Sequence, residues 1–296
     1  MFGKMVSDMM IKPGNAPVFG SPTDFGLDFE AVEFQASDGV TLRGWLIPGG
    51  TDKVIVQSHF GVQCSRAGYT PEGKGMIKMW KEDISFLRQA QYLHSKGYTV
   101  LMYDLRNHGE SDLGTIPWVT WGPEEAKDVI AAVDFVARHP LYGNAEIGLL
   151  SICMGSAATT YAYGLGDEGL ARYPQIRAMV AVQPLHYKNF VKAFGMPEFL
   201  DAMGRKLSLE RTGLNLAEKT FLPDTASIPV PTRVVQNRND PWTDLAFVEA
   251  YFDGLPGEKE MLWLDLEKSR AASYEELGRT PGRILDFFDQ HLQVAH

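Results

Sequence analysis

The chain has 296 residues, of which 45% are hydrophobic and 22% are charged, and its formal net charge is −9. This is the composition of a globular protein with one large core. The acidic balance, without a dense run of lysine and arginine, argues against nucleic acid and anionic membrane surfaces as partners. No segment approaches the roughly 20 apolar residues of a membrane span. Two cysteines are too few for a disulfide framework, so we expect a reducing, cytoplasmic setting.

Strand-like and helix-like segments alternate along the chain. Residues 29–34 and 41–48 are expected to form an antiparallel strand pair. Further strands are predicted at residues 53–61, 98–105, 145–152, 176–184, 232–240 and 260–266, with helices at 82–97, 122–140, 156–165, 244–255 and 281–292. Apolar strands separated by helices predict an α/β fold whose mainly parallel, eight-stranded sheet has helices on both faces. Ligands bind such sheets at the carboxyl ends of the strands.

One stretch, residues 185–228, separates two strands by far more than a usual crossover. We interpret it as a small helical cap inserted into a core of residues 29–184 and 229–296, with residues 1–28 as an N-terminal extension. Its large apolar side chains either pack the cap onto the core or line a pocket for an apolar acyl or aromatic substrate. As candidate substrate-binding residues we take Phe190, Phe194, Met196 and Phe199.

The segment LLSICMGSAA, residues 149–158, has the pattern of a nucleophile elbow. In such an elbow, a strand turns sharply into a helix and small residues flank a side chain that is presented above the sheet. Here Ser151 and Gly155 are the small flanks and Cys153 is the presented residue. Taken alone, the pattern also fits a cysteine that is merely a small buried hydrophobe.

Three further segments follow in the order expected for one fold family. QSHFG (57–61) is similar to a His-Gly turn, YDLRNHGESD (103–112) to an Arg-x-His-Gly-x-Ser segment, and QNRNDPWTD (236–244) to a segment that supplies a catalytic acid. With these segments, the chain resembles the α/β-hydrolase superfamily over nearly its whole length. A cysteine nucleophile is similar to that of the dienelactone hydrolases, whose triad is Cys, Asp and His.

This resemblance implies a role for each matching residue. Cys153 would be the nucleophile and Asp240 the acid of the triad, although Asp240 could instead cap the helix that follows. The backbone amides of Phe60 and Met154 would form the oxyanion hole. No metal and no cofactor are implied.

The family histidine is missing. The loop after the last strand, residues 265–282, contains none, and Ser269 or Arg270 occupies its approximate place, where neither can serve as a base. Cysteine depends less on a base than serine does, so attack by Cys153 survives, whereas activation of water is weakened. His186, which follows the sixth strand, is the candidate replacement base. Otherwise it is a cap-packing or surface histidine.

The sequence therefore predicts an enzyme that acts on an ester, thioester or lactone carbonyl through an acyl intermediate on Cys153. A hydrolase is the first interpretation. An acyltransferase or condensing enzyme is the alternative, because poor water activation leaves the acyl group for another acceptor. A catalytically silent protein of the same fold that binds a small ligand is the third. The expected partner is a small acyl or aromatic molecule, and the oligomeric state is left open.

Overall fold

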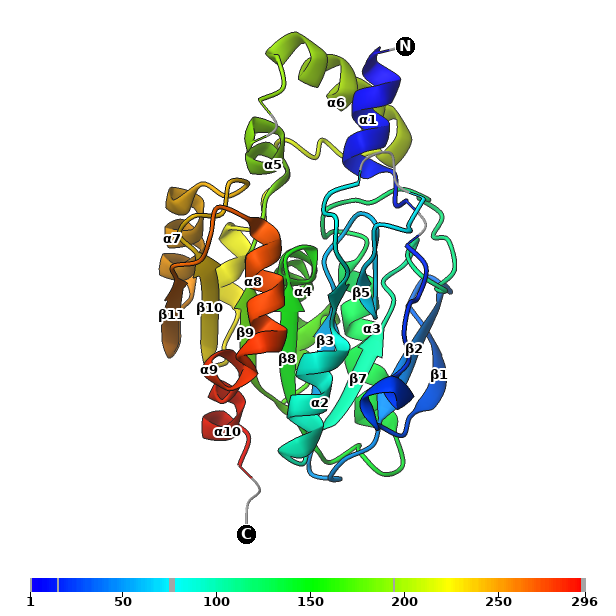
Figure 1. Cartoon of the computed structure of the whole chain (residues 1–296), viewed down its shortest axis with the longest axis vertical. Helices are drawn as coiled ribbons and strands as arrows, with labels where there is room; N and C mark the ends of the chain where they lie inside the picture. Colours follow the sequence, from blue (N-terminus) through cyan, green and yellow to red (C-terminus); the bar gives the residue numbers. More distant parts are fainter. Residues whose placement is uncertain (1, 15, 75–77, 194, 294–296) are drawn as a thin grey trace.

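The structure is a computed structural model that describes residues 2–14, 16–74, 78–193 and 195–293. Its described residues form an eight-stranded sheet in the order β1–β2–β7–β3–β8–β9–β10–β11 (Figure 1). The first two neighbouring pairs are antiparallel and the others are parallel, which confirms the predicted mainly parallel sheet. The strands are β1 Glu30–Gln35, β2 Thr41–Ile47, β3 Lys53–Ser58, β7 Thr99–Tyr103, β8 Glu146–Ile152, β9 Ile176–Val182, β10 Thr232–Asn237 and β11 Lys259–Leu264.

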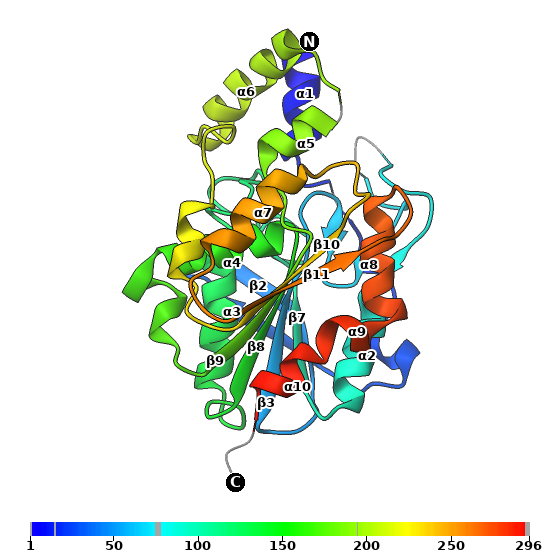
Figure 2. The same cartoon turned by 90° about the vertical axis from the view of Figure 1, so that its left-hand side faces the viewer.

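Helices cover both faces of the sheet (Figure 2). One face carries α2 (Leu87–Ser95), α8 (Arg270–Arg279), α9 (Pro281–Leu285) and α10 (Phe287–His291), and the other carries α3 (Ala126–Arg138), α4 (Met154–Gly164) and α7 (Leu245–Gly254). Successive strand side chains enter opposite layers: Ile55 packs on the α2 side, and Val54 and Val56 pack on the α3 side. Short elements complete the core: β4 Cys64–Ser65, β5 Gly68–Tyr69, β6 Ile84–Ser85, and the 3₁₀ turns η1 Pro22–Phe25, η2 Gly166–Glu168, η3 Leu170–Arg172 and η4 Pro223–Ser227.

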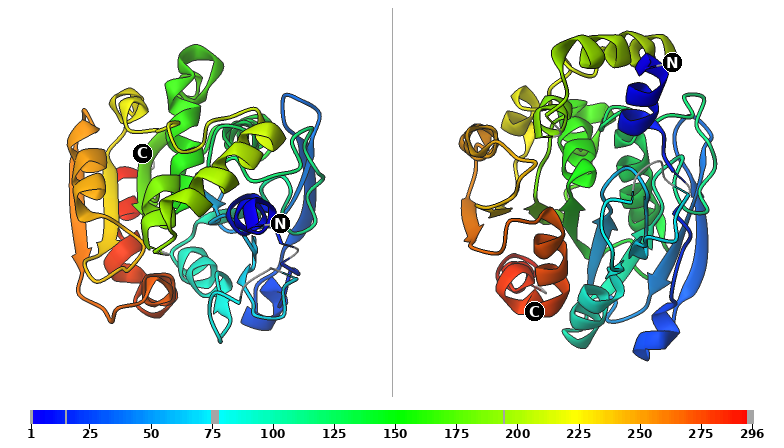
Figure 3. Two further views of the ribbon diagram at one scale, coloured as in Figure 1. Left: turned by 90° about the horizontal axis from the view of Figure 1, so that it is seen from above. Right: turned by 45° about the horizontal axis from the view of Figure 1, so that its top comes forward.

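The segment expected to form a cap contains α5 (Tyr187–Ala193) and α6 (Glu198–Thr212), which stand beyond the carboxyl edge of the sheet. The N-terminal helix α1 (Phe2–Ile11) lies against α6, so two segments that the sequence separates form one unit (Figure 3). Small residues allow this close approach: a Cβ on Gly204 would lie 2.2 Å from Val6 Cγ1. The Ser7 and Ser208 hydroxyls hydrogen-bond at 3.0 Å.

Neither α1 nor the helix α8 was predicted. Residues 265–282 were expected to be a loop, but α8 begins there at Arg270. Its buried residues Arg270, Tyr274 and Leu277 recur at helical spacing and lie on the sheet side. The family pattern drew attention to the missing histidine in this stretch and away from its periodicity.

Candidate active site

The turn from β8 into α4 holds Cys153 in a strained backbone conformation. Its φ of 53° and ψ of −104° are rare for a residue other than glycine. The following turn passes close to β3, because a Cβ at Gly155 would lie 2.4 Å from the Ser58 carbonyl oxygen. The Ser151 hydroxyl forms a 2.8 Å hydrogen bond with the Thr159 hydroxyl of α4. The Cys153 side chain is therefore presented at the start of α4, where helix amides favour negative charge.

Asp240 lies in the turn after β10 and is buried. It accepts hydrogen bonds from the Trp242 amide at 3.0 Å and from the Thr243 hydroxyl at 2.7 Å. The N-cap of α7 is Asp244, whose side chain accepts from the Ala246 amide, so Asp240 does not cap that helix. The carboxylate of Asp240 instead accepts a charge-assisted hydrogen bond from Arg270.

Arg270, the first residue of α8, is 1% exposed. Its guanidinium has five N–H groups and cannot accept a proton. Four of them donate to oxygen atoms of the surrounding protein: Asp240 Oδ2, Thr243 Oγ1 at 3.0 Å, the Gln183 carbonyl at 2.5 Å and the Tyr274 hydroxyl at 2.8 Å. One N–H group remains, and the guanidinium borders the same cavity as Cys153.

Gln183 is part of this arrangement. It follows β9 with a φ of 54°, and this left-handed conformation accompanies the bond from its carbonyl to Arg270. Its amide nitrogen hydrogen-bonds the Ser273 hydroxyl on α8. The end of β9 and the start of α8 are thereby tied together beside Cys153.

Tyr274 lies one turn after Arg270 on α8 and borders the same cavity as Cys153. Burial raises the pKa of its phenol well above the usual value, against the lowering effect of Arg270. For Arg270, burial would lower the pKa, but Tyr274, Asp240 and Cys153 outweigh it and raise the pKa. Cys153 therefore shares its cavity with a fixed cation and a neutral phenol, and Arg270, paired with Asp240, stands where the family resemblance implies a histidine.

The contacts of His186 argue against its predicted role as the base. Its Nε2 donates to the Lys219 carbonyl at 2.7 Å, and its Nδ1 accepts from the Lys188 amide at 3.3 Å. The ring stacks on Phe247 with centroids 5.8 Å apart. Both nitrogens are thus in use within the cap, and His186 does not line the cavity that contains Cys153. The position of a histidine after a strand does not identify it as a base, because its ring can point away from the nucleophile.

The two amides expected to form the oxyanion hole border the same cavity. Met154 is the first residue of α4, where an amide has no acceptor within the helix. The Phe60 turn is fixed by His59, whose Nδ1 donates to the Phe60 carbonyl at 2.7 Å and whose Nε2 accepts from the Leu105 amide at 3.0 Å. Burial and the neighbouring His108 lower the pKa of His59 to about 3, so its imidazole is neutral. His59 is thus a structural residue.

The cavity over Cys153 is narrow and mostly apolar, with a volume of about 30 Å³. Its aromatic walls are Phe60, Trp80, Trp121, Phe190, Trp242 and Tyr274. Trp80 stacks on Trp242 with centroids 5.5 Å apart. The sequence analysis missed the three tryptophans, which lie on separate loops and form no pattern along the chain.

Among the four cap residues predicted to bind substrate, only Phe190 is found in this lining. Met196 is absent from the lining, and Phe199 is 66% exposed, so the structure does not bring these two residues to the cavity over Cys153. Phe194 lies outside the described residues. Apolar character in the cap did not distinguish residues that face the core from residues that face solvent.

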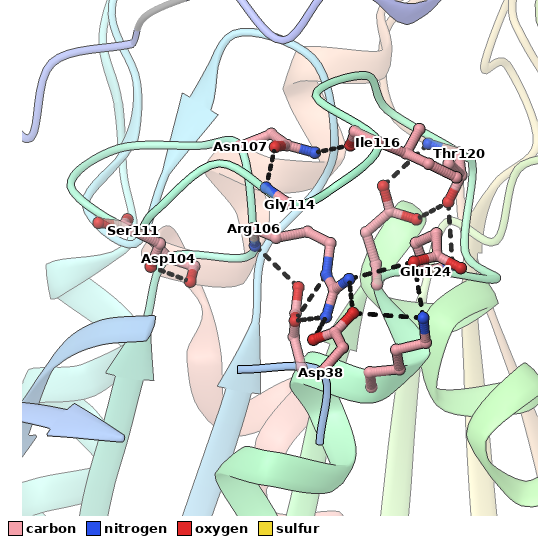
Figure 4. Close-up of polar contacts among 12 residues, drawn as sticks. Asp38, Asp104, Arg106, Asn107, Ser111, Gly114, Ile116, Thr120 and Glu124 are labelled. Atoms are coloured by element: carbon pink, nitrogen blue, oxygen red, sulfur yellow. Dashed lines mark hydrogen bonds and ion pairs between the residues drawn. The ribbon is translucent and has the colours of Figure 1, made fainter. Parts of the chain in front are cut away.

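The loop between β7 and α3 supplies another wall, through Val119 and Trp121. Figure 4 shows the ionic network at its base, in which the buried Arg106 guanidinium joins Asp38 at 2.7 Å and Glu124 at 3.2 Å. Asp128 of α3 accepts from Arg106 Nε at 2.9 Å. This network attaches the loop to α3 and to the turn between β1 and β2.

With this geometry in view, comparison with known proteins identifies the family. Residues 75–290 match the alpha/beta hydrolase family, and the chain belongs to it. Relatives include a polyketide transferase of Aspergillus fumigatus, 27% identical over 161 residues, which are 54% of this chain and 47% of that protein. A polyketide transferase of a Penicillium species is 28% identical over 167 residues, 56% of this chain and 47% of that protein. The chain thus spans about half the length of these curated relatives.

Solved structures agree on the fold. An esterase of Pyrococcus furiosus has a TM-score of 0.69 at 21% identity, covering 95% of this chain and 98% of the esterase. A dienelactone hydrolase of Anabaena variabilis has a TM-score of 0.53 at 16% identity, covering 90% and 99%. Among the described helices, none has the length and apolar character needed to cross a membrane.

Proposed function

We propose that this protein is an acyltransferase that holds an acyl group as a thioester on Cys153 and passes it to an acceptor other than water. One observation carries the proposal: Arg270, a donor that cannot accept a proton, stands between Asp240 and Cys153 where a base would be needed. Water is a poor nucleophile without a base, so hydrolysis of the acyl-enzyme is slow.

In the first half-reaction, the Cys153 sulfur attacks the donor carbonyl as a thiolate, beside the Arg270 guanidinium and at the start of α4. The carbonyl electrons move to oxygen, and the resulting oxyanion accepts hydrogen bonds from the backbone amides of Phe60 and Met154. The oxyanion then reforms the carbonyl and expels the donor's leaving group, which leaves the acyl group on sulfur. An incoming nucleophile reverses the sequence and releases the thiolate.

The names of the relatives favour transfer over hydrolysis. Two are polyketide transferases and a third is an acyltransferase of Aspergillus calidoustus, 26% identical over 158 residues. The alpha/beta hydrolase family supplies the elbow and the oxyanion turn.

Mass spectrometry of the acyl-enzyme tests the proposal. The protein is treated with the neutral thioester S-acetyl-N-acetylcysteamine, and we expect an acetyl adduct on Cys153 that persists in buffer and disappears when a thiol is added. Arg270→His places an imidazole between Asp240 and Cys153, and we expect it to speed hydrolysis of the adduct by about 10²-fold or more. Arg270→Met is the matched control and should bring no such gain.

Each alternative predicts a different result. An adduct that water removes as fast as thiols do would establish a hydrolase and overturn the proposal. Failure of every acyl donor to modify Cys153 would indicate a catalytically silent binding protein.

A further inference from the structure

The chemistry of the site restricts both the acyl donor and the acceptor, if the proposed acyl transfer is correct. An oxygen ester must expel an alkoxide, a strong base that needs a proton from the enzyme. Neither neighbour of Cys153 supplies one readily, because Arg270 stays protonated and burial raises the pKa of Tyr274 well above its usual value. A thioester expels a thiolate, which leaves without a proton. By reversal, a thiol is the acceptor that attacks without a base.

The narrow cavity over Cys153 adjoins a larger one of about 270 Å³, which we call the vestibule. The two cavities share four lining residues: Val62, Met79, Phe190 and Trp242. Because the inner cavity has room for little more than the reacting carbonyl and a short acyl group, the thiol arm of a thioester must extend into the vestibule.

Lysines from two separate segments line the vestibule in a protein of net charge −9. Lys12 follows α1 and Lys78 belongs to the segment before β6, and both side chains are exposed. Neither forms an ion pair with another residue of the described ranges. One carboxylate, Asp8, lies in the same lining, but Lys4 at 2.5 Å and Arg211 at 2.8 Å already neutralise it.

The protonation state of Asp8 agrees with that pairing. Burial would raise the pKa of its carboxyl, but hydrogen bonds from Lys4 and Arg211 hold it below the usual value. Its charge is thus committed to these two partners. The vestibule presents Lys12 and Lys78 as cations available to a ligand.

We propose that the donor is a thioester whose thiol arm carries a phosphate, and that Lys12 and Lys78 bind this phosphate while the acyl carbonyl lies at Cys153. The bonds exchanged are sulfur–carbon bonds alone: the donor's breaks as Cys153 gains the acyl group, and the donor leaves as a thiolate. The acceptor thiolate then takes the acyl group and restores the Cys153 thiolate. No oxidant, reductant or other co-reactant is consumed.

Direct binding tests the vestibule without depending on catalysis. Calorimetry on the full-length Cys153→Ala protein compares coenzyme A, 4′-phosphopantetheine and pantetheine, which lacks phosphate. We expect the two phosphorylated thiols to bind and pantetheine to bind at least about tenfold more weakly, with an affinity that falls as salt rises. Equal binding by coenzyme A and phosphopantetheine indicates that the arm's own phosphate is bound, as on a carrier protein. Binding of coenzyme A alone indicates a free nucleotide thioester.

Lysine variants test whether Lys12 and Lys78 bind the phosphate. Lys12→Ala/Lys78→Ala should weaken binding of the phosphorylated thiols by about tenfold, because two exposed ion pairs with the phosphate are lost. Lys206→Ala removes an exposed lysine of α6 that does not line the vestibule, and it should change nothing. Equal affinity for pantetheine and its phosphate, or a double variant that binds like the parent, would overturn this proposal even if Cys153 forms its adduct.

Acylation rates test the reaction class. Acetylation of Cys153 by acetyl coenzyme A should be at least about tenfold faster than by S-acetyl-N-acetylcysteamine at equal concentration, and the double lysine variant should remove that difference. An oxygen ester such as ethyl acetate should give no adduct on the same timescale. Acylation by the ester at the rate of the thioester would refute the restriction to thiols.

Discussion

Replacing Arg270 by methionine should strongly destabilise the fold, mainly because Asp240 loses its partner. The side chains are 1% and 0% exposed, and the pair is joined by a direct hydrogen bond. Removing the guanidinium leaves the carboxylate buried without a counter-charge and deprives the Gln183 carbonyl of a donor. Breaking a buried pair on one side costs about 3–5 kcal/mol. That is about a fifth or more of the 5–15 kcal/mol typical of a whole domain.

Urea unfolding followed by tryptophan fluorescence measures this free energy. Asp240→Asn alone should also cost several kcal/mol, because it leaves the cation unpaired. The double variant should cost less than the sum of the two, with a coupling of about 2–3 kcal/mol, since losing the second charge removes a penalty created by losing the first.

An exposed pair provides the control. Arg138 and Asp134 pair at 3.0 Å on α3 with 79% and 27% of their side chains exposed, so Arg138→Met should cost less than about 1 kcal/mol. If Arg270→Met cost no more than this control, or if the two site variants were strictly additive, the pair would not be the buried, charge-coupled unit described above.

Three further predictions concern the nucleophile, its turn and the ionic network. Iodoacetamide should label Cys153 well before Cys64, because burial raises the pKa of the Cys64 thiol, and equal rates by peptide mass analysis would contradict an activated Cys153. Gly155→Ala should slow acylation by about 10²-fold, since its Cβ would displace the elbow, and an unchanged adduct rate would contradict the close contact. Burial would raise the pKa of the Asp38 carboxyl, but Arg106 lowers it to about 2. This is below the unfolded value of about 3.9. The stabilisation that Asp38 gives the folded state is therefore present above about pH 4 and is lost as the pH falls towards 2. Asp38→Asn should flatten that acid limb in unfolding measured between pH 5 and 2.

Much of the sheet could be predicted because its signals are local. The apolar run of β8 and the small residues around Cys153 carry both the strand and the elbow in one segment, and Asp240 lies in the turn after β10. Parallel strands bring such ends to one edge, so order along the chain was enough to collect these residues.

The groups around Cys153 could not be predicted from local sequence patterns. Arg270 looked like a residue that merely replaced a histidine, because its partners Asp240, Gln183 and Tyr274 come from three different places in the chain. Tyr274 could have been found from the helical spacing of α8, which brings it one turn after Arg270. The direction of the His186 ring depends on a carbonyl 33 residues away, and no local pattern encodes it.

The pairing of α1 with α6 bears on the order in which the molecule assembles. The hydrogen bond between Ser7 and Ser208 joins residues 201 positions apart, so α1 is synthesised long before its partner exists. Contacts of such separation form late in folding, because a long loop must close before they contribute. Cys153 and its strand neighbours belong to the sheet, whereas Lys12 depends on the late contact. During refolding, the faster alkylation of Cys153 relative to Cys64 should therefore return first. The preference among acyl donors should return only afterwards.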